Sequence, residues 1–466
     1  MKRYKRIGIL LGVLLVISGA AYGVSRYEER KEAIKNSDEV ILEVSSEEVK
    51  ALSWECETGS YAFHKEEGWI YDEDEAFPVD EEKIGELLEI FEEFGVSFVI
   101  EDVEDFAQYG LEEPVCKIYL ETEEAALEVL LGNYSAMDSQ RYVSIGDGKV
   151  YLVQNDPLDL FAIEISDIIA HDEIPSLEGV TRIRFDGAES GQIAYEENSS
   201  GSYYDGDVYF MEGEEESLPL DTDKVDSYLN AVEQLGLTDY VTYNASEEEL
   251  ASCGLDEPEL SLTVAYTAEN DEGEKSEETF VLHIGRDPEE QASPEEDAGE
   301  EAEEAVTAYA RVGDSPIIYR ISSDSYEKLT ATSYDALRHS EIFWAAAGDI
   351  TGLDITLEDT DYTITSESGE EGRTFYYQEE ELETAGLFSA VRGITADSFT
   401  EETPSGKEEI SLTVYLDNEN YPQVSLAFYR YDGELCIAEV DGEPVAFVKR
   451  ADVVALTEAV YGIVLK

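Results

Sequence analysis

Histidines are the residues of this chain with the most obvious capacity to bind a metal ion or to transfer protons, and there are only four. No two of them stand at the i,i+4 spacing, and none lies in an H-E-x-x-H motif. The pattern therefore predicts no metal site, and we expect no cofactor. The four are His64, His171, His283 and His339.

The cysteines form no recognisable redox or metal motif. There is no C-x-x-C pair and no neighbouring histidine, and Cys116 falls on the apolar face of a predicted strand. We therefore expect buried single thiols rather than disulfides. The four are Cys56, Cys116, Cys253 and Cys436.

Other catalytic motifs are equally scarce. The sequence contains no G-x-S-x-G, no P-loop and no dinucleotide fingerprint. Carboxylate pairs such as Asp72 and Asp74 would suit general acid–base work, as in a hydrolase of envelope glycan. With 110 acidic residues such pairs arise by chance throughout the chain. We predict a non-enzymatic protein, with the glycan hydrolase as the alternative.

Tyrosine is the one reactive or interface-forming residue type that is abundant, with 30 copies, many on predicted strands. Half-buried tyrosines on strands are ordinary structural residues. An exposed aromatic face for a partner protein or a glycan is the functional alternative. Examples are Tyr203, Tyr204, Tyr376, Tyr377, Tyr429 and Tyr431.

A repeated motif organises the elements around these residues. Y-G-L-E-E-P at 109–114 returns as C-G-L-D-E-P at 253–258. Each glycine suits the left-handed position just after a helix, the following leucine packs back onto that helix, and the proline stops it. The predicted structural motif consists of Gly110, Leu111, Pro114, Gly254, Leu255 and Pro258.

The residues before each motif predict the helix that the glycine ends. Ser246 and Glu249 form a capping-box pattern, and Asp102 and Asp105 occupy the equivalent places in the first copy. After each motif comes an alternating strand, and then further strands that end at Gly132 and Gly285. Gly and Pro thus divide the chain into repeating strand–helix units.

Helical spacing upstream shows the same duplication. Asp80 and Asp221 each begin a helix with apolar residues on one face, at one constant spacing between the copies. We predict an α+β fold of tandem strand–helix repeats with mostly antiparallel sheet. The first copy spans residues 40–172, the second 180–345, and a degenerate third copy without the Gly-Leu-x-x-Pro motif spans 350–466.

An acidic insertion separates two strands of the second copy. Residues 287–305 are rich in Glu, Ala and Pro and lack aromatics, so we expect a disordered loop. A calcium loop is the competing interpretation, but the alternating oxygen ligands around a central glycine are missing.

The first 31 residues predict a membrane anchor. A basic start precedes an uncharged apolar run from Ile7 to Val24, which at about 1.5 Å per residue spans roughly 27 Å. We favour an uncleaved transmembrane signal-anchor, with the bulk of the chain outside the cytoplasm. A cleaved signal peptide is the alternative, since small residues follow from Ser18 to Ala21.

Charge excludes whole classes of partner. The net charge is −80, and because residues 1–31 contribute +5, the remainder carries −85. Such a surface repels nucleic acid and anionic headgroups, so we expect no nucleic-acid partner.

The basic start, the single anchor and the two units Tyr109–Pro114 with Gly132 and Gly254–Pro258 with Gly285 resemble the bacterial envelope family called domain of unknown function 4340. The resemblance covers residues 1–345 well and the last third weakly. It implies a membrane-anchored protein of the cell membrane without assigned activity, encoded beside export-type ABC transporters. We therefore expect an extracytoplasmic binding or assembly module with transporter subunits or other envelope proteins as partners.

Overall fold

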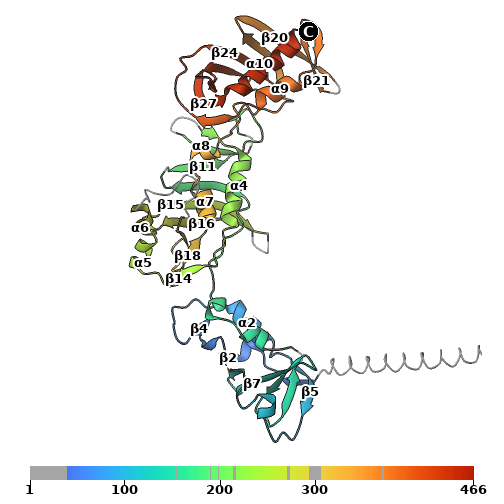
Figure 1. Ribbon diagram of the computed structural model, residues 1–466, viewed down its shortest axis with the longest axis vertical. Helices are drawn as coiled ribbons and strands as arrows, with labels where there is room; N and C mark the ends of the chain where they lie inside the picture. The colour runs from blue at the N-terminus through green and yellow to red at the C-terminus, as the bar shows by residue number, and fades with distance from the viewer. Residues whose placement is uncertain are drawn as a thin grey trace, which may run out of the picture. The chain divides into compact units, whose positions relative to one another are not determined.

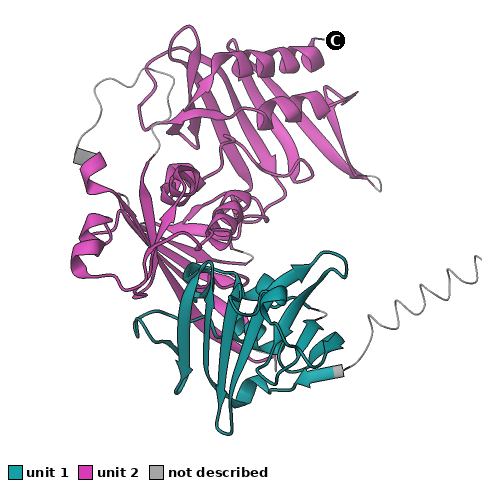
Figure 2. Cartoon of the chain, turned by 60° about the horizontal axis from the view of Figure 1, so that its bottom comes forward, with its two compact units in different colours: residues 1–172 teal, residues 173–466 magenta. Residues whose placement is uncertain are grey.

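The computed structural model describes residues 39–465, apart from residues 154, 189, 198, 214–216, 270–272, 293–305 and 370–371. The chain divides into two compact units, residues 1–172 and 173–466 (Figure 2). The predicted anchor Ile7–Val24 lies outside the described residues. Within them no helix is both long and apolar enough to span a bilayer.

The first unit contains the first copy. Its elements in chain order are β1 (Glu39–Leu42), η1 (Ser46–Glu48), β2 (Val49–Cys56), β3 (Gly59–Lys65), β4 (Trp69–Tyr71), α2 (Glu81–Glu89), β5 (Phe94–Ile100), η2 (Ala107–Tyr109), β6 (Cys116–Thr122), β7 (Ala126–Ser135), β8 (Gln140–Ser144), β9 (Val150–Val153), α3 (Leu158–Phe161) and η3 (Ile165–Ile168).

The second copy opens the second unit. Its elements are β10 (Val180–Asp186), β11 (Gly191–Tyr195), β12 (Tyr209–Glu212), β13 (Ser217–Pro219), α4 (Thr222–Glu233), β14 (Tyr240–Thr242), α5 (Glu247–Ser252), β15 (Leu260–Glu269), β16 (Lys275–Arg286), α6 (Pro288–Ala292), β17 (Ala308–Val312), β18 (Ile318–Ile321), α7 (Ser323–Thr330) and α8 (Tyr334–Leu337).

The third copy completes this unit. Its elements are β19 (Ile350–Leu357), β20 (Thr360–Gly369), β21 (Gly372–Tyr377), β22 (Glu380–Leu382), α9 (Ala385–Arg392), β23 (Ala396–Phe399), β24 (Glu408–Leu416), β25 (Gln423–Arg430), β26 (Leu435–Val440), β27 (Glu443–Lys449) and α10 (Arg450–Val464) (Figure 1).

Each copy builds a nine-stranded antiparallel sheet, and the three sheets share one strand order. The common order is β5-β9-β8-β7-β6-β2-β3-β4 in the first sheet, β14-β18-β17-β16-β15-β10-β11-β12 in the second and β23-β27-β26-β25-β24-β19-β20-β21 in the third. The ninth strand is β1, beside β5, in the first sheet, and β13 or β22 at the opposite edge in the others. The predicted α+β class with mostly antiparallel sheet is confirmed. The third copy keeps the whole sheet and lacks only the short helix and its turn.

One face of each sheet, which we call the inner face, packs against the longer helices. In the third copy α10 contacts α9 and strands β24, β26 and β27, and Figure 2 shows two helices side by side on that face. The core between them joins strand residues such as Leu412 and Leu426 to helix residues such as Phe388 and Leu456. Alternation along the strands explains this, because every second side chain points inward.

The Gly-Leu-x-x-Pro turns have the hydrogen bonds of a Schellman cap in both copies. Gly110 has φ 74° and Gly254 has φ 65°. The Leu111 and Leu255 amides donate to the carbonyls five residues back, at 3.1 and 2.8 Å. Both leucines are buried. Pro114 and Pro258 then precede β6 and β15 by two residues.

In the first copy, the start of the short helix before the Gly-Leu-x-x-Pro turn differs from its prediction. Ser246 and Glu249 form the expected capping box at α5. In the first copy the segment is only the 3-10 turn η2, whose amino-terminal cap makes no side-chain bond. Asp102 has φ 54°, outside the conformation of a helix cap, and Asp105 accepts from the Ala107 amide instead.

The expectation of four single thiols is wrong for two of them. Cys56 and Cys116 are directly opposite on the paired strands β2 and β6, with Cα atoms 4.3 Å apart, and form a disulfide. Sequence spacing does not reveal this register, since 60 residues separate the two. Cys253 and Cys436 are free and buried, as predicted.

The acidic insertion is partly structured. Its first residues form α6, and the Glu290 carboxylate accepts hydrogen bonds from the Thr307 amide and hydroxyl, at 3.0 and 2.6 Å. The expectation of a loop without structure over 287–305 is therefore wrong for this part. Residues 293–305 lie outside the described part of the chain.

Candidate functional site

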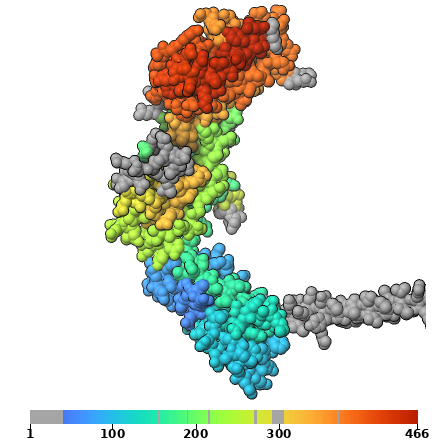
Figure 3. Space-filling view, in the orientation of Figure 1, coloured from blue at the N-terminus to red at the C-terminus, as the bar shows by residue number. Residues whose placement is uncertain are grey.

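A group of buried polar side chains lies where the second copy meets the third. The loop 199–208, between β11 and β12 of the second copy, places Tyr203 in the apolar core of the third. Its ring stacks on Phe343, with centroids 5.6 Å apart, and burial raises the pKa of its hydroxyl well above the usual range. In the space-filling view the surfaces of the two copies meet without a break (Figure 3). These contacts explain why residues 173–466 form one unit.

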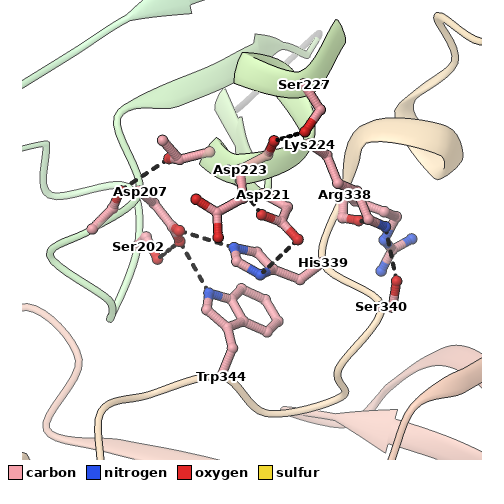
Figure 4. Close-up of polar contacts among 12 residues, drawn as sticks. Ser202, Asp207, Asp221, Asp223, Lys224, Ser227, Arg338, His339, Ser340 and Trp344 are labelled. Carbon is pink, nitrogen blue, oxygen red and sulfur yellow. Dashed lines mark hydrogen bonds and ion pairs between the residues drawn. The ribbon is translucent and has the colours of Figure 1, made fainter. Parts of the chain in front are cut away.

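Asp207 from the same loop is the polar centre of this junction. Its side chain is fully buried, and its carboxylate accepts from the Ser202 hydroxyl at 2.5 Å and from the Trp344 indole N–H at 3.0 Å. The third partner is His339, whose Nε2 lies 2.8 Å from Oδ1 (Figure 4). A carboxylate only accepts, so the Nε2 of His339 carries the donated proton.

His339 is fixed by stacking as well as by this bond. Its ring lies 4.3 Å from the indole of Trp344 at an interplanar angle of 12°. Only 9 % of its side chain is exposed. The other ring nitrogen, Nδ1, points to Asp221, whose Oδ2 lies 3.9 Å away.

Asp221 and Glu341 complete a group with His339. One donor atom from each of the three lies within 4.8 Å of the others. Asp221 is the amino-terminal cap of α4, and its Oδ1 accepts from the Asp223 amide at 3.0 Å. Oδ2 is therefore the atom of Asp221 that faces the imidazole.

The linker that carries His339 and Glu341 is attached to both copies. On one side the Leu337 carbonyl accepts from the Asp221 amide. On the other, Glu341 pairs with Thr395, and the Ile342 amide donates to Ile394.

Cations strengthen the same linker. The Lys224 ammonium donates to the Arg338 carbonyl and the Ser340 hydroxyl, both at 2.8 Å. The guanidinium of Arg338 lies 4.1 Å from the ring centre of Phe399 and 4.8 Å from that of Tyr334. Phe399 belongs to the third copy and Tyr334 to the second, so one side chain joins them.

The chemistry of this group is not that of an acyl-transfer triad. In a triad the histidine accepts the proton of the nucleophilic hydroxyl. Here Ser202 and His339 both donate to the same carboxylate. The arrangement fixes the junction and leaves His339 Nδ1 facing Asp221 Oδ2, with a carboxylate oxygen of Glu341 in the same group.

A second candidate surface is the outer face of the third sheet, opposite α9 and α10. A shallow groove of about 350 Å³ crosses β19, β24, β25 and β26. Small hydroxyl side chains and carboxylates line it. The hydroxyls are those of Thr356, Ser411, Thr413 and Ser425, and the carboxylates those of Asp354, Glu408 and Glu439.

Beside the groove runs an apolar row that we call the outer ladder: Tyr429, Ile437 and Phe447, with Tyr431. Ile437 at its centre is only 2 % exposed, whereas Tyr429 and Phe447 are half-buried. Tyr429 is paired with Ile437, and Ile437 with Phe447, across β25, β26 and β27. The Tyr431 ring lies 4.8 Å from that of Phe447, and 49 % of Tyr431 is exposed.

In the second copy the corresponding part of the face is covered. There Tyr309 of β17 and Ile318 of β18 form a separate apolar cluster with Cys253 and Leu255 of the Gly-Leu-x-x-Pro turn. The third copy has no such turn, and the aromatic rings of its outer ladder remain half-buried or exposed around the buried Ile437.

The structural motif residues lie on the scaffold and outside both candidate surfaces. Sequence reasoning placed Asp221 correctly as a helix cap but missed Asp207, His339 and Glu341 as a group. The long stretch Glu196 to Asp207 with its two adjacent tyrosines was the available indication, because the first copy has only a short turn between the matching strands.

The carboxyl of Asp226 on α4 has a raised pKa, mainly because burial disfavours its charge, with a further rise from Asp223 on the same helix. The Tyr209 hydroxyl beside it acts in the opposite direction.

Comparison with known proteins gives one kind of match. No curated protein and no solved structure matches the chain. The family model described as "Domain of unknown function (DUF4340)" matches residues 69–258 and again residues 213–413. The first match contains Gly110 and ends at Pro258, and the second contains Gly254. Together the matches span more than half of the sequence, and the chain belongs to this family of unknown function.

Proposed function

We propose that this protein is a non-enzymatic binding or assembly module, anchored in the cell membrane by Ile7–Val24 and acting outside the cytoplasm as an accessory of an ABC-type export system. The observation that carries the proposal is the outer ladder, where Tyr429, Tyr431 and Phe447 surround the buried Ile437 and keep part of their rings at the surface of the third sheet. Aromatic side chains on such a face suit a protein interface.

The disulfide supports the location. Cys56 and Cys116 are joined, and disulfides persist in oxidising compartments outside the cytoplasm.

The occupant that we propose for the outer ladder is an extracytoplasmic segment of a transporter subunit. The carboxylates Asp354, Glu408 and Glu439 beside it favour a segment with lysine or arginine next to apolar residues. An acidic polymer would be repelled by the chain as a whole, whose net charge is −80.

Affinity purification of the intact protein from mild detergent tests the proposal. We expect a transmembrane transporter subunit to be recovered, and less of it with a version that lacks residues 1–31, because membrane confinement raises the effective concentration of both partners. Tyr431→Ser should lower recovery. Tyr134→Ser is the matched control, since Tyr134 is 51 % exposed in the first copy.

Two results would contradict the proposal. In the first, the intact protein is purified from detergent without a transmembrane partner and its soluble part cleaves envelope glycan. That result would favour the hydrolase. The other is equal recovery with the Tyr431 and Tyr134 variants, which would remove the outer ladder from the interface. Retention on membranes after carbonate washing tests the anchor separately, because apolar burial is not screened by salt.

A further inference from the structure

The lone pair of His339 points into a pair of carboxylates. Nε2 donates to Asp207, so in a neutral imidazole Nδ1 carries a lone pair, and it faces Asp221 Oδ2 at 3.9 Å. No hydrogen bond to Nδ1 exists in the part of the chain that the structure describes. The side chain as a whole is nine-tenths buried.

No neighbouring cation relieves the repulsion. Lys224 is the nearest candidate on α4, but its ammonium is directed at Arg338 and Ser340. Within the described residues, neither Asp221 nor Glu341 pairs with a lysine or arginine. Three electron-pair donors thus converge on one point without a positive charge between them.

We propose that Asp221, His339 and Glu341 bind a divalent transition cation of the Zn²⁺ class. One imidazole with two carboxylates is a donor set for such ions, whereas Ca²⁺ and Mg²⁺ take oxygen ligands. Ligand atoms at about 2.0–2.2 Å from Zn²⁺ in a tetrahedral arrangement lie roughly 3.3–3.6 Å apart. The 3.9 Å separation of His339 Nδ1 and Asp221 Oδ2 needs only a small contraction to reach this.

Asp207 has the position of the outer carboxylate in a carboxylate–histidine–metal arrangement. Such a group fixes the tautomer and the orientation of the ligating ring and raises its basicity. Asp207 is itself fixed by Ser202 and Trp344. This support distinguishes the group from the many exposed carboxylate clusters of an acidic protein.

The cation would join two parts of the second unit. Asp221 begins α4 of the second copy, whereas Glu341 lies on the linker segment that pairs with Thr395 of the third. A metal held by both therefore stabilises the junction of the two copies. This inference does not depend on the proposed function, and a failure of either leaves the other standing.

Zinc titration of the full chain tests the site. The protein is purified in mild detergent, stripped with a chelator and titrated with Zn²⁺ by calorimetry in excess Mg²⁺, which occupies weak surface carboxylates. We expect one tight site per chain, and a Co²⁺-substituted sample should show the visible absorption of a ligated ion. Zn²⁺ should also raise the melting temperature, because ligand binding to the native state stabilises it.

Two conservative variants and one control test whether the bound ion occupies the proposed site. Asp221→Asn keeps the helix cap, and Glu341→Gln keeps the side-chain volume, so both should fold. Each should weaken Zn²⁺ binding at least tenfold. Asp223→Asn removes the same charge two residues along α4 and should leave the affinity unchanged. A chain without a tight site, or one whose affinity falls equally in all three variants, would overturn the proposal.

Discussion

Gly132 lies directly against the carbonyl oxygen of Tyr109, so closely that a Cβ on Gly132 would be 2.3 Å from it. Gly285 has the same relationship to the Cys253 carbonyl, at 2.5 Å. In both copies the Schellman turn that follows the short helix packs directly against a glycine of the neighbouring strand. The two parts of the sequence motif are thus the two sides of one contact.

Gly132→Ala should therefore destabilise the first copy, by about 1–3 kcal/mol, because the turn must move away from β7. Urea unfolding measures the change. Gly85→Ala is the control, since no atom lies within 4 Å of a Cβ at that helical position. We expect that control to be neutral or slightly stabilising. Equal losses in the two variants would argue against the contact.

Gly110→Val tests the turn itself. A β-branched residue at φ 74° costs on the order of 1 kcal/mol or more, and its Cβ would also collide with the Asn133 side chain. Glu112→Ala, an exposed change in the same motif, should have little effect. Thermal melting compares the two, and indistinguishable midpoints would exclude a left-handed requirement at Gly110.

Local patterns were sufficient to predict the scaffold. Helical spacing after Asp80 and Asp221 predicted α2 and α4, and the glycines predicted both Schellman caps. Each of these depends on residues within a few positions of one another, so the sequence contains the whole determinant.

Features that depend on strand register and on loop docking were not predictable in this way. The disulfide requires β2 to pair with β6 so that Cys56 meets Cys116. The polar junction requires the 199–208 loop to enter another copy, which brings Asp207 to His339 across 132 residues. No local periodicity encodes either approach.

Thiol counting checks the disulfide. Without reductant, the native protein should show no reactive thiol, because Cys253 and Cys436 are buried and burial raises the pKa of Cys436 to about 11. Denaturation should expose two thiols, and reduction should give four. Replacing Cys56 and Cys116 by serine should cost roughly 4 kcal/mol for a closed loop of this length. Four thiols in the unreduced, denatured chain would contradict the pairing.

His64 should show a pH-dependent ion pair with Asp72. The hydrogen bond to that carboxylate, at 2.6 Å, raises the pKa of His64 above 6.5. A raised native pKa stabilises the fold while the imidazole is protonated, below the unfolded value, and this contribution is lost as the pH rises through the native pKa.

Asp72→Asn should therefore destabilise the protein at about pH 5 and much less at about pH 9. Proton NMR titration should show the His64 pKa moving down in this variant. In a His64→Gln background the same substitution should lose its pH dependence. A difference that persists in that background would assign the effect to another group.

Asp207 should control the junction between the second and third copies. Its buried carboxylate accepts hydrogen bonds from Ser202, His339 and Trp344. Asp207→Ala therefore leaves three donors without their common acceptor. A buried donor left without its acceptor costs about 1–3 kcal/mol. Asp205→Ala, an exposed change in the same loop, should cost little.

Hydrogen exchange in metal-free buffer can assign this loss to the junction. The Ile342 amide donates to Ile394, and the Ala396 amide donates to Ser340, so these two report on the linker. Asp207→Ala should accelerate their exchange while Val414, within the third sheet, keeps its protection. The Asp205 variant should change none of the three. Uniform acceleration throughout the third copy would show that Asp207 supports the whole fold of this unit. Unchanged exchange at Ile342 and Ala396 would show that Tyr203 and the Arg338 contacts hold the junction without Asp207.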